Sequence, residues 1–204
     1  MSRVGLVDYG VCNLDSVARA VEECGGVPVI GRQPDDLADV AAIVLPGVGT
    51  FSQGMRNLRE RRLDEALQEQ VIGNEIPLLG LCLGMQLLAT VGAEGGADRG
   101  LGWIDGEVVR LEPRDGERVP HVGWNEVHAV DNSALFRGIE PGRDFYFVHS
   151  YHLACRDQAA VAARTPAYGG FAAAVAGEHV MGVQFHPEKS QRVGFQLLKN
   201  FLLM

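Results

Sequence analysis

The sequence predicts a single α/β domain in which a mainly parallel sheet is covered by helices on both faces. In the first half, short apolar runs alternate with segments of helical periodicity, which is typical of successive strand–helix units. These runs are apolar throughout, as expected for strands buried on both faces of a sheet. In the second half, short strands separated by turns predict antiparallel additions to the sheet.

The elements of the first half follow from apolar periodicity and local stop signals. Arg3–Asp8 reads as a buried strand, and Leu14–Cys24 carries apolar residues at helical spacing. Asn13 stands at the N-cap position of this helix, and Gly25–Gly26 is a typical C-terminal stop. Further strands are expected at Val27–Ile30, Ala41–Leu45 and Pro77–Leu81, and further helices at Arg56–Ile72 and Met85–Val91.

The second half is expected to be rich in strands and to close with a helix. The predicted strands are Gly106–Leu111, Asn125–Val130, Phe145–Ala154, Val161–Arg164, Phe171–Val175 and Val180–Phe185, followed by an amphipathic helix at Val193–Leu203. Nothing resembling a linker, a repeat or a low-complexity tract divides the 204 residues, so one domain is expected over 1–204.

Composition excludes several classes of function. The net charge of −8 argues against nucleic-acid binding as the main task, because such proteins usually gather Lys and Arg. The chain has no apolar run of the roughly 18 residues needed to span a bilayer, and its N-terminus lacks the features of a secretory signal. The four cysteines are widely spaced, which argues against a zinc site or a disulfide scaffold. A cytoplasmic location is therefore expected.

The most informative segment is a Gly-x-Cys-x-Gly pattern that follows an apolar strand and opens a helix. Cys82 is flanked by Gly80 and Gly84, the arrangement of a nucleophile elbow with cysteine in the nucleophile position. The helix dipole would favour the thiolate, and the Leu83 amide would help to form an oxyanion hole. A buried structural cysteine is the alternative, and it remains our interpretation of Cys12, Cys24 and Cys155.

A candidate base and its orienting partner follow the last predicted strand. In the extended segment His186-Pro187-Glu188, the first and third side chains point to the same side. Glu188 could then accept a hydrogen bond from one ring nitrogen of His186 and leave the other nitrogen for the thiol, which is the logic of a catalytic triad. The alternative is a surface histidine beside a solvated glutamate.

Two glycines after the predicted strand Ala41–Leu45 mark a second loop of interest. Gly47-Val48-Gly49 lacks the Gly-Lys-Ser/Thr of a phosphate loop, and Ser52 breaks the dinucleotide pattern. We expect this loop to supply a second oxyanion donor, with an ordinary strand–helix turn as the alternative. The remaining histidines show no ligand spacing, so no metal is expected; they are His121, His128, His149, His152 and His179.

Together these segments resemble the class I (triad) glutamine amidotransferases. Gly80–Gln86 and Phe185–Glu188 mark the class. Within it, the chain is similar to the glutaminase subunits of imidazole glycerol phosphate synthase, a histidine-biosynthesis enzyme. That resemblance rests on Asp8–Gly10 with Asn13, Leu45–Phe51, Pro120–Asn125, Tyr146–Tyr151 and Gln184–Ser190. It implies a flavodoxin-like fold, hydrolysis of glutamine to glutamate and ammonia, and no cofactor.

The resemblance also implies roles for individual residues. Cys82, His186 and Glu188 would be catalytic. The remaining roles would fall to Gly49 and Leu83 as the oxyanion hole, to Gln86, His149, Ser150 and Tyr151 as the glutamine site, and to Asn13, Trp124 and Asn125 at the interface or ammonia passage. The implied partner is a separate (β/α)-barrel cyclase subunit, which would form a heterodimer with the chain and receive ammonia through a closed passage. The segment Gly47–Gly49 would reorient for activity, so that turnover depends on the partner.

One residue departs from the family pattern, since Cys12 stands where a glycine is usual. If that position requires a positive φ, the cysteine would strain the loop.

Three other interpretations of the function stay open: a glutaminase for another synthase such as the pyridoxal phosphate enzyme, a cysteine hydrolase of the DJ-1 group, and a scaffold subunit without activity. The Gly-Trp-Asn segment, the His-Pro-Glu segment and the intact triad residues, respectively, argue against them.

Overall fold

The computed structural model describes residues 2–114, 116–130 and 133–204. Its strands are β1 (Arg3–Val7), β2 (Val27–Gly31), β3 (Ala42–Gly47), β4 (Leu78–Cys82), β5 (Ala89–Gly92), β6 (Asp98–Arg99), β7 (Ile104–Arg110), β8 (His121–Ala129), β9 (Arg143–His149), β10 (Tyr151–Cys155), β11 (Val161–Thr165), β12 (Phe171–Ala176) and β13 (Val180–Val183). Its α-helices are α1 (Leu14–Glu23), α2 (Phe51–Glu60), α3 (Leu63–Leu67), α4 (Leu83–Leu87) and α5 (Gln191–Leu202). Short helical turns include the π-helix η2 (Gln68–Gly73) and the 3₁₀ turns η3 (Ala134–Phe136) and η6 (Pro187–Lys189).

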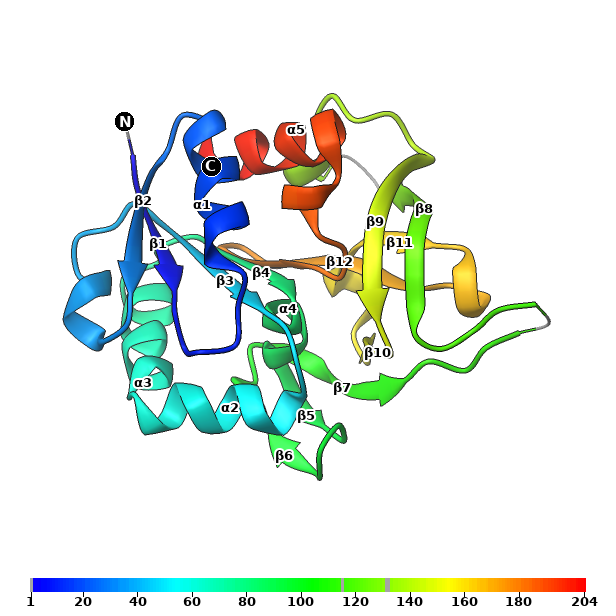
Figure 1. Cartoon of the computed structure of the whole chain (residues 1–204), viewed down its shortest axis with the longest axis horizontal. Coiled ribbons are helices and arrows are strands. Elements are labelled where there is room, and N and C mark those ends of the chain that lie inside the picture. The colour runs from blue at the N-terminus through cyan, green and yellow to red at the C-terminus, as the bar shows by residue number, and fades with distance from the viewer. Residues whose placement is uncertain (1, 115, 131–132) are drawn as a thin grey trace.

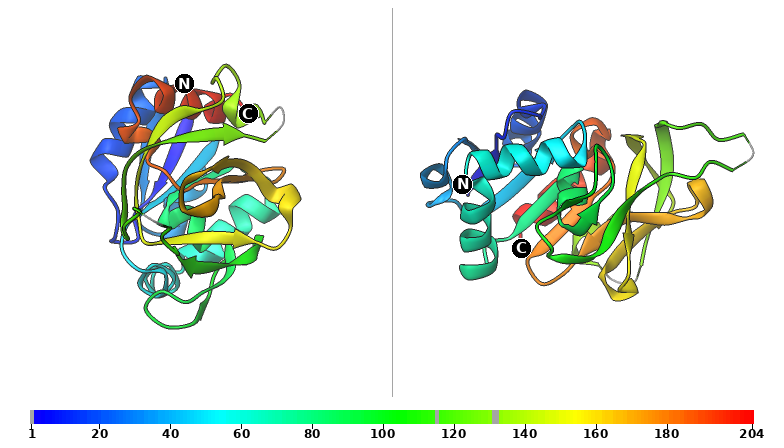
Figure 2. Two further views of the ribbon diagram at one scale, coloured as in Figure 1. Left: turned by 90° about the vertical axis from the view of Figure 1, so that its right-hand side faces the viewer. Right: turned by 90° about the horizontal axis from the view of Figure 1, so that it is seen from below.

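A nine-stranded sheet forms the centre of the molecule, in the order β2-β1-β3-β4-β13-β12-β11-β8-β9. The first five strands of that order pair in parallel, and the rest pair antiparallel. Helices α1 and α5 pack on one face of the parallel part, whereas α2, α3 and α4 pack on the other (Figure 1). The view from below shows α2 in front of the sheet and α5 behind it (Figure 2). The predicted α/β architecture with antiparallel additions is therefore confirmed.

The prediction of one continuous strand over Phe145–Ala154 is wrong, and the error matters for the site. The strand is interrupted at Ser150, so that β9 joins the edge of the large sheet while β10 joins a second sheet of order β10-β7-β5-β6. Apolar alternation runs through the whole segment, and Ser150 is no strong breaker. Sequence periodicity therefore could not reveal that the segment crosses from one sheet to another.

Two predicted helices also need correction. The helix expected at Arg56–Ile72 begins earlier, at Phe51, and is broken at Arg62, which has a φ of 55°. A non-glycine residue rarely adopts this conformation, and the sequence there contains no glycine or proline to announce it. The helix expected at Met85–Val91 is the short α4, and the chain then enters β5.

Helix α1 ends in a Schellman motif, in which the Gly25 and Gly26 amides donate to the carbonyls of Glu22 and Val21 at 2.9 and 3.0 Å. Cys12 is not among the residues with positive φ, so the strain considered for this position is absent.

No helix in the described parts of the chain is long and apolar enough to cross a membrane.

Candidate active site

Cys82 lies at the sharp turn between β4 and α4, in the strained geometry of a nucleophile elbow. Its φ of 54° and ψ of −107° are unusual for a residue with a side chain, and they turn the thiol toward the carboxyl ends of the strands. The turn is possible because its flanks are glycines. A methyl group at Gly80 would lie 2.7 Å from the Gly84 backbone, and one at Gly84 would lie 1.7 Å from the Leu45 carbonyl oxygen.

Replacing Gly84 by alanine is expected to lower the free energy of unfolding by more than about 3 kcal/mol, because backbone atoms cannot move aside for the new methyl group. Urea unfolding measures the change. Gly73→Ala is the matched control, since a methyl group there meets only the Gln68 carbonyl oxygen at 4.0 Å. We expect a change within about 1 kcal/mol for the control. Equal stability of the two variants would contradict the packing described for the elbow.

His186 and Glu188 form a buried pair directly after β13, the strand that lies beside β4 in the sheet. The Nδ1 atom of His186 lies 2.8 Å from Oε1 of Glu188, and the two side chains are only 6% and 3% exposed. The other ring nitrogen, Nε2, has no hydrogen-bond partner in the chain, so it is available for proton transfer. Burial on its own lowers the pKa of His186, but the neighbouring Cys82 thiol and Glu188 carboxylate raise it to about 9.

The Cys82 thiol lies near polar groups from two other parts of the chain. Its Sγ lies 3.9 Å from the Val148 carbonyl oxygen of β9 and accepts from the Gln184 amide at 3.6 Å. Gln184 is fully buried, and its own carbonyl oxygen accepts from Gln86 at 3.0 Å. Gln184 was not among the site residues predicted from the sequence. The available signal was a glutamine inside an apolar strand, two residues before His186 and therefore on the same side of the chain.

A pocket of about 230 Å³ opens beside Cys82. Its walls contain all six residues that were expected to hold glutamine or an oxyanion, together with Cys82 and three residues for which no such role was expected. The lining residues are Val48, Gly49, Cys82, Leu83, Gln86, Glu94, Val148, His149, Ser150 and Tyr151. The break at Ser150 explains this arrangement, because it places the turn between the two sheets against the helix N-terminus that carries the thiol. Glu94 is the acidic member of these three, beside Val48 and Val148, and burial raises the pKa of its carboxyl group.

The glycine loop after β3 packs closely against the elbow. A methyl group at Gly47 would lie 2.0 Å from the buried Tyr9 hydroxyl oxygen, so only glycine fits there. Gly49 has a φ of 99°, which also favours glycine. Between them, the Val48 amide donates to the Val11 carbonyl oxygen at 2.9 Å. In this conformation the Val48 amide is therefore engaged with the β1–α1 loop and does not serve the Cys82 pocket.

The three residues expected at a partner interface lie in different settings. Trp124 is 44% exposed and packs edge-on against Tyr146 at 5.8 Å between ring centroids. Asn125 is on the opposite face of β8, where its amide nitrogen lies 2.6 Å from Nε2 of His121. Asn13 occupies the N-cap position of α1 but makes no capping bond, and its amide instead donates to Ser16 at 3.2 Å.

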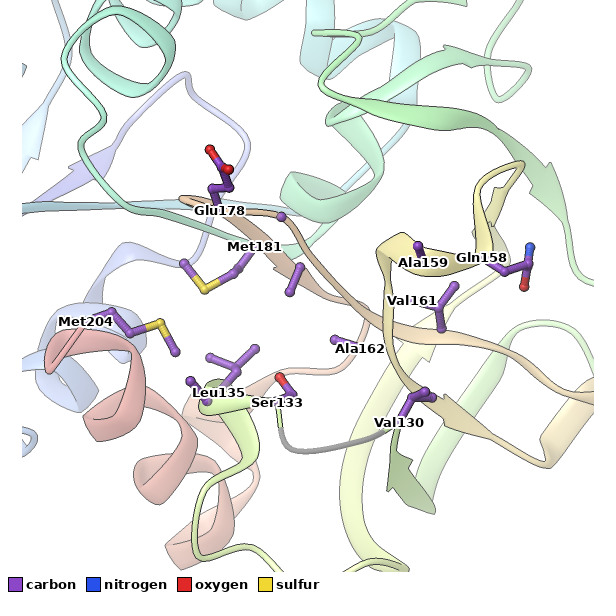
Figure 3. Close-up of a pocket in the computed structure, with 13 residues that line it drawn as sticks. Val130, Ser133, Leu135, Gln158, Ala159, Val161, Ala162, Glu178, Met181 and Met204 are labelled. Atoms are coloured by element: carbon purple, nitrogen blue, oxygen red, sulfur yellow. The ribbon is translucent and has the colours of Figure 1, made fainter.

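A larger pocket of about 490 Å³ lies elsewhere, between η3, the β12–β13 turn and the end of the chain (Figure 3). Leu135, Met181 and Met204 are among its apolar wall residues, and Glu178 stands at one side. The residues that line it include neither a cysteine nor a histidine, and none of them also lines the Cys82 pocket. The candidate nucleophile Cys82 therefore lies beside the smaller pocket.

Comparison with known proteins agrees with this geometry. Residues 5–204 match the family described as glutamine amidotransferase class-I. A solved structure described as a glutamine amidotransferase superposes with a TM-score of 0.75 at 19% identity, over 98% of this chain and 97% of that one. The structure of PurLQS from Thermotoga maritima gives 0.74 at 20% identity, over 100% and 97% of the two chains. The chain belongs to the class I glutamine amidotransferases.

Full-length relatives narrow the assignment. Subunit HisH 1 of imidazole glycerol phosphate synthase from Campylobacter jejuni strain RM1221 is 45% identical, over 98% of both chains. Subunit HisH 2 of the same synthase from Pseudomonas aeruginosa PAO1 is 42% identical, over 97% of both chains. Within its class, the chain is a member of the HisH family of imidazole glycerol phosphate synthase subunits.

Proposed function

We propose that Cys82, His186 and Glu188 hydrolyse glutamine to glutamate and ammonia, and that the ammonia passes to a cyclase subunit of imidazole glycerol phosphate synthase. One observation carries this proposal. The strand β4 ends in a cysteine on a strained elbow, a buried histidine–glutamate pair follows the neighbouring parallel strand β13, and a pocket of amino-acid size lies beside the cysteine. This is the arrangement that covalent hydrolysis of an amide requires.

The geometry supports a two-stage reaction. The Cys82 thiolate attacks the side-chain amide carbon of glutamine, and the backbone amides of Leu83 and Gly49, which line the pocket, stabilise the oxyanion in this proposal. His186, held as an imidazolium by Glu188, gives its proton to the departing amine, which leaves as ammonia and a thioester. Neutral His186 then takes a proton from water, which attacks the thioester and releases glutamate and the thiolate. One water molecule is consumed for each glutamine.

Glu94 is proposed to hold the α-ammonium group of glutamine. It lines the Cys82 pocket and is the only Asp or Glu among the residues that form its walls. Replacing it by glutamine is expected to raise the KM for glutamine roughly tenfold or more while kcat changes little, because uniform binding is lost. Steady-state release of glutamate measures both constants. A fall in kcat at unchanged KM would contradict this role.

The proposed partner is the (β/α)-barrel cyclase, bound over the mouth of the Cys82 pocket to form a heterodimer. Val122 and Trp124 project from one face of β8 and are 57% and 44% exposed. Val122 pairs with Val148, which lines the pocket together with the 44% exposed Val48. Exposed apolar side chains on β8 and at the pocket suit a protein partner. Such a partner would also shield ammonia from water, where protonation would remove its nucleophilicity.

The hydrogen bond between the Val48 amide and the Val11 carbonyl oxygen supports a further proposal, that the rate of glutamine hydrolysis depends on the partner. In the present conformation this amide is bonded to Val11 on the first loop, beside the surface on which a partner would rest. Reorientation of Gly47–Gly49 would release it toward the reacting carbonyl as an additional oxyanion donor. The chain alone is therefore expected to be a slow glutaminase, and the complex a fast one.

Glutamate release is the test, measured with the purified chain alone and then with the barrel cyclase and its nucleotide substrate. Weak activity alone and strong stimulation in the complex are expected. If the complex forms and no glutamate appears in either condition, the proposal fails. If activity were equal with and without the cyclase, the proposal of glutamine hydrolysis would stand, and the proposal that its rate depends on the partner would be rejected.

A further inference from the structure

A line of buried hydrogen bonds leads away from the glutamine pocket to β8. The Nδ1 atom of His149 lies 2.8 Å from the Tyr151 carbonyl oxygen, in the wall of the pocket. Nε2 of His149 lies 3.0 Å from Nδ1 of His121. Nε2 of His121 lies 2.6 Å from the amide nitrogen of Asn125. The two imidazole rings are 7% and 3% exposed, so water does not compete for these bonds.

The direction of every proton in this line can be deduced from its inner end. The Tyr151 carbonyl can only accept, so Nδ1 of His149 carries the hydrogen. Nε2 of a neutral His149 must then accept, which places the hydrogen of His121 on Nδ1. Nε2 of His121 accepts in turn, and the amide nitrogen of Asn125 is the donor that it needs. With both rings neutral, every donor in the line meets one acceptor.

The surroundings favour the neutral form of both rings. His121 stacks on Phe147 with 4.7 Å between centroids, and Tyr168 lies 4.9 Å away on a tilted plane. Burial lowers the pKa of His149 to about 3, although the bond to the Tyr151 carbonyl opposes this change. Burial likewise lowers the pKa of His121 to about 4, with Glu117 acting in the opposite direction.

At its inner end the line joins the polar groups around the nucleophile. The Tyr151 carbonyl oxygen also accepts from the Gln86 amide at 2.8 Å. Gln86 donates to Gln184, and Gln184 donates to the Cys82 thiol. The orientation of Tyr151 therefore affects both the pocket wall and the hydrogen bond to the sulfur. A cluster that served packing alone would not need to end on these groups.

We propose that His121 and Asn125 are positioning residues for glutamine, which act through His149 on the Tyr151 carbonyl and Gln86 without touching the substrate. The inference rests on the proposed glutaminase activity. The line of hydrogen bonds from Asn125 through His121 and His149 to Tyr151, here called the relay, sets the geometry of the glutamine pocket. The bulk of the two rings is not sufficient for this. Two variants of His121 separate these contributions.

Phenylalanine at position 121 keeps an aromatic ring against Phe147 but removes both hydrogen bonds of the relay. Glutamine at the same position loses the ring but offers one donor and one acceptor. We expect His121→Phe to raise the KM for glutamine roughly tenfold and His121→Gln to raise it less than about threefold, measured in complex with the cyclase. Equal KM values for His121→Phe and the wild type would overturn the proposal, as would a larger defect in His121→Gln than in His121→Phe.

A spectroscopic measurement tests the relay without any turnover. Ring nitrogen shifts of protein labelled with ¹⁵N-histidine report the tautomer of each imidazole. In the Cys82→Ser background, His121 and His149 are both expected as neutral rings with hydrogen on Nδ1 between about pH 6 and 8. This tautomer is the minor one for free histidine, so its presence at both positions would support the relay. Hydrogen on Nε2 of either ring, or protonation in this range, would overturn it.

Asn125→Ala keeps the proposal testable if the His121 variants do not fold. It removes the outer donor and leaves both rings in place, and we expect a KM increase of roughly threefold with an unchanged thermal midpoint. A fall in the midpoint with no change in KM would show a purely structural role and reject the proposal. If the wild-type complex released no glutamate, the proposed function would fail, whereas the tautomers would still decide whether the relay exists.

Discussion

Replacing Cys82 by serine is expected to reduce glutamate release more than about 10³-fold, both in the isolated chain and in the complex with the cyclase. A hydroxyl group has nearly the same size as a thiol but is a far weaker nucleophile without a strong base. The elbow and its glycines would be unchanged, so the folded structure and the binding of glutamine should persist. Single-turnover release of glutamate, together with isothermal titration with glutamine, measures both properties.

Cys155→Ser is the matched control for this substitution. Burial raises the pKa of the Cys155 thiol to about 11, and this thiol lies outside the pocket walls. It therefore remains protonated near neutral pH, and its replacement should leave turnover within about twofold. If Cys82→Ser kept more than a few per cent of the wild-type rate, Cys82 would not be the nucleophile.

Replacing Glu188 by glutamine is expected to lower kcat roughly 10³-fold, with little change in KM. The carboxylate orients His186 through the 2.8 Å contact with Nδ1 and stabilises the imidazolium that donates to the leaving amine. The sign of the pH effect follows from the pKa of about 9 for His186. Wild-type activity should persist below this pKa and decline as the pH rises through it. Loss of Glu188 removes a group that raises the pKa, so the decline should begin at lower pH.

The chain offers a matched control for Glu188 in β8. Glu126 and His128 form a second pair at the same spacing, with Oε2 and Nε2 3.0 Å apart, but both side chains are 49% exposed. Glu126→Gln should therefore leave kcat and the pH profile unchanged. If Glu188→Gln kept the wild-type rate and the wild-type decline of activity at alkaline pH, proton transfer by His186 would not depend on Glu188. The triad would then have to be revised.

Local chemistry explains which parts of the site were predictable. The elbow around Cys82 and the His186–Glu188 pair each lie within a few residues of sequence, so spacing and residue type were sufficient to propose them. Gln184 and Glu94 were missed because their roles depend on which strands become neighbours. The relay through His121 and His149 was missed for the same reason, since pairing of β8 with β9 places these residues opposite each other.

The overall architecture was predictable for a related reason, and its errors have local causes. Fully apolar strands alternating with helices indicated the parallel sheet. No glycine or proline marked the break at Arg62, where the backbone adopts a positive φ. No sequence signal marked the passage of the chain at Ser150 from the large sheet to the small one, because both strands continue the same apolar alternation.

The position of β13 in the sheet has a consequence for synthesis of the protein. It is the last strand in the chain, yet it lies in the middle of the large sheet, between β4 and β12. On the ribosome, β4 and its nucleophile emerge about a hundred residues before the strand that brings His186 alongside. The two halves of the sheet can join only when this strand inserts, so a nascent chain would hold an exposed thiol without a base. Maturation of the fold would thus delay hydrolytic competence until β13 has been translated and has inserted.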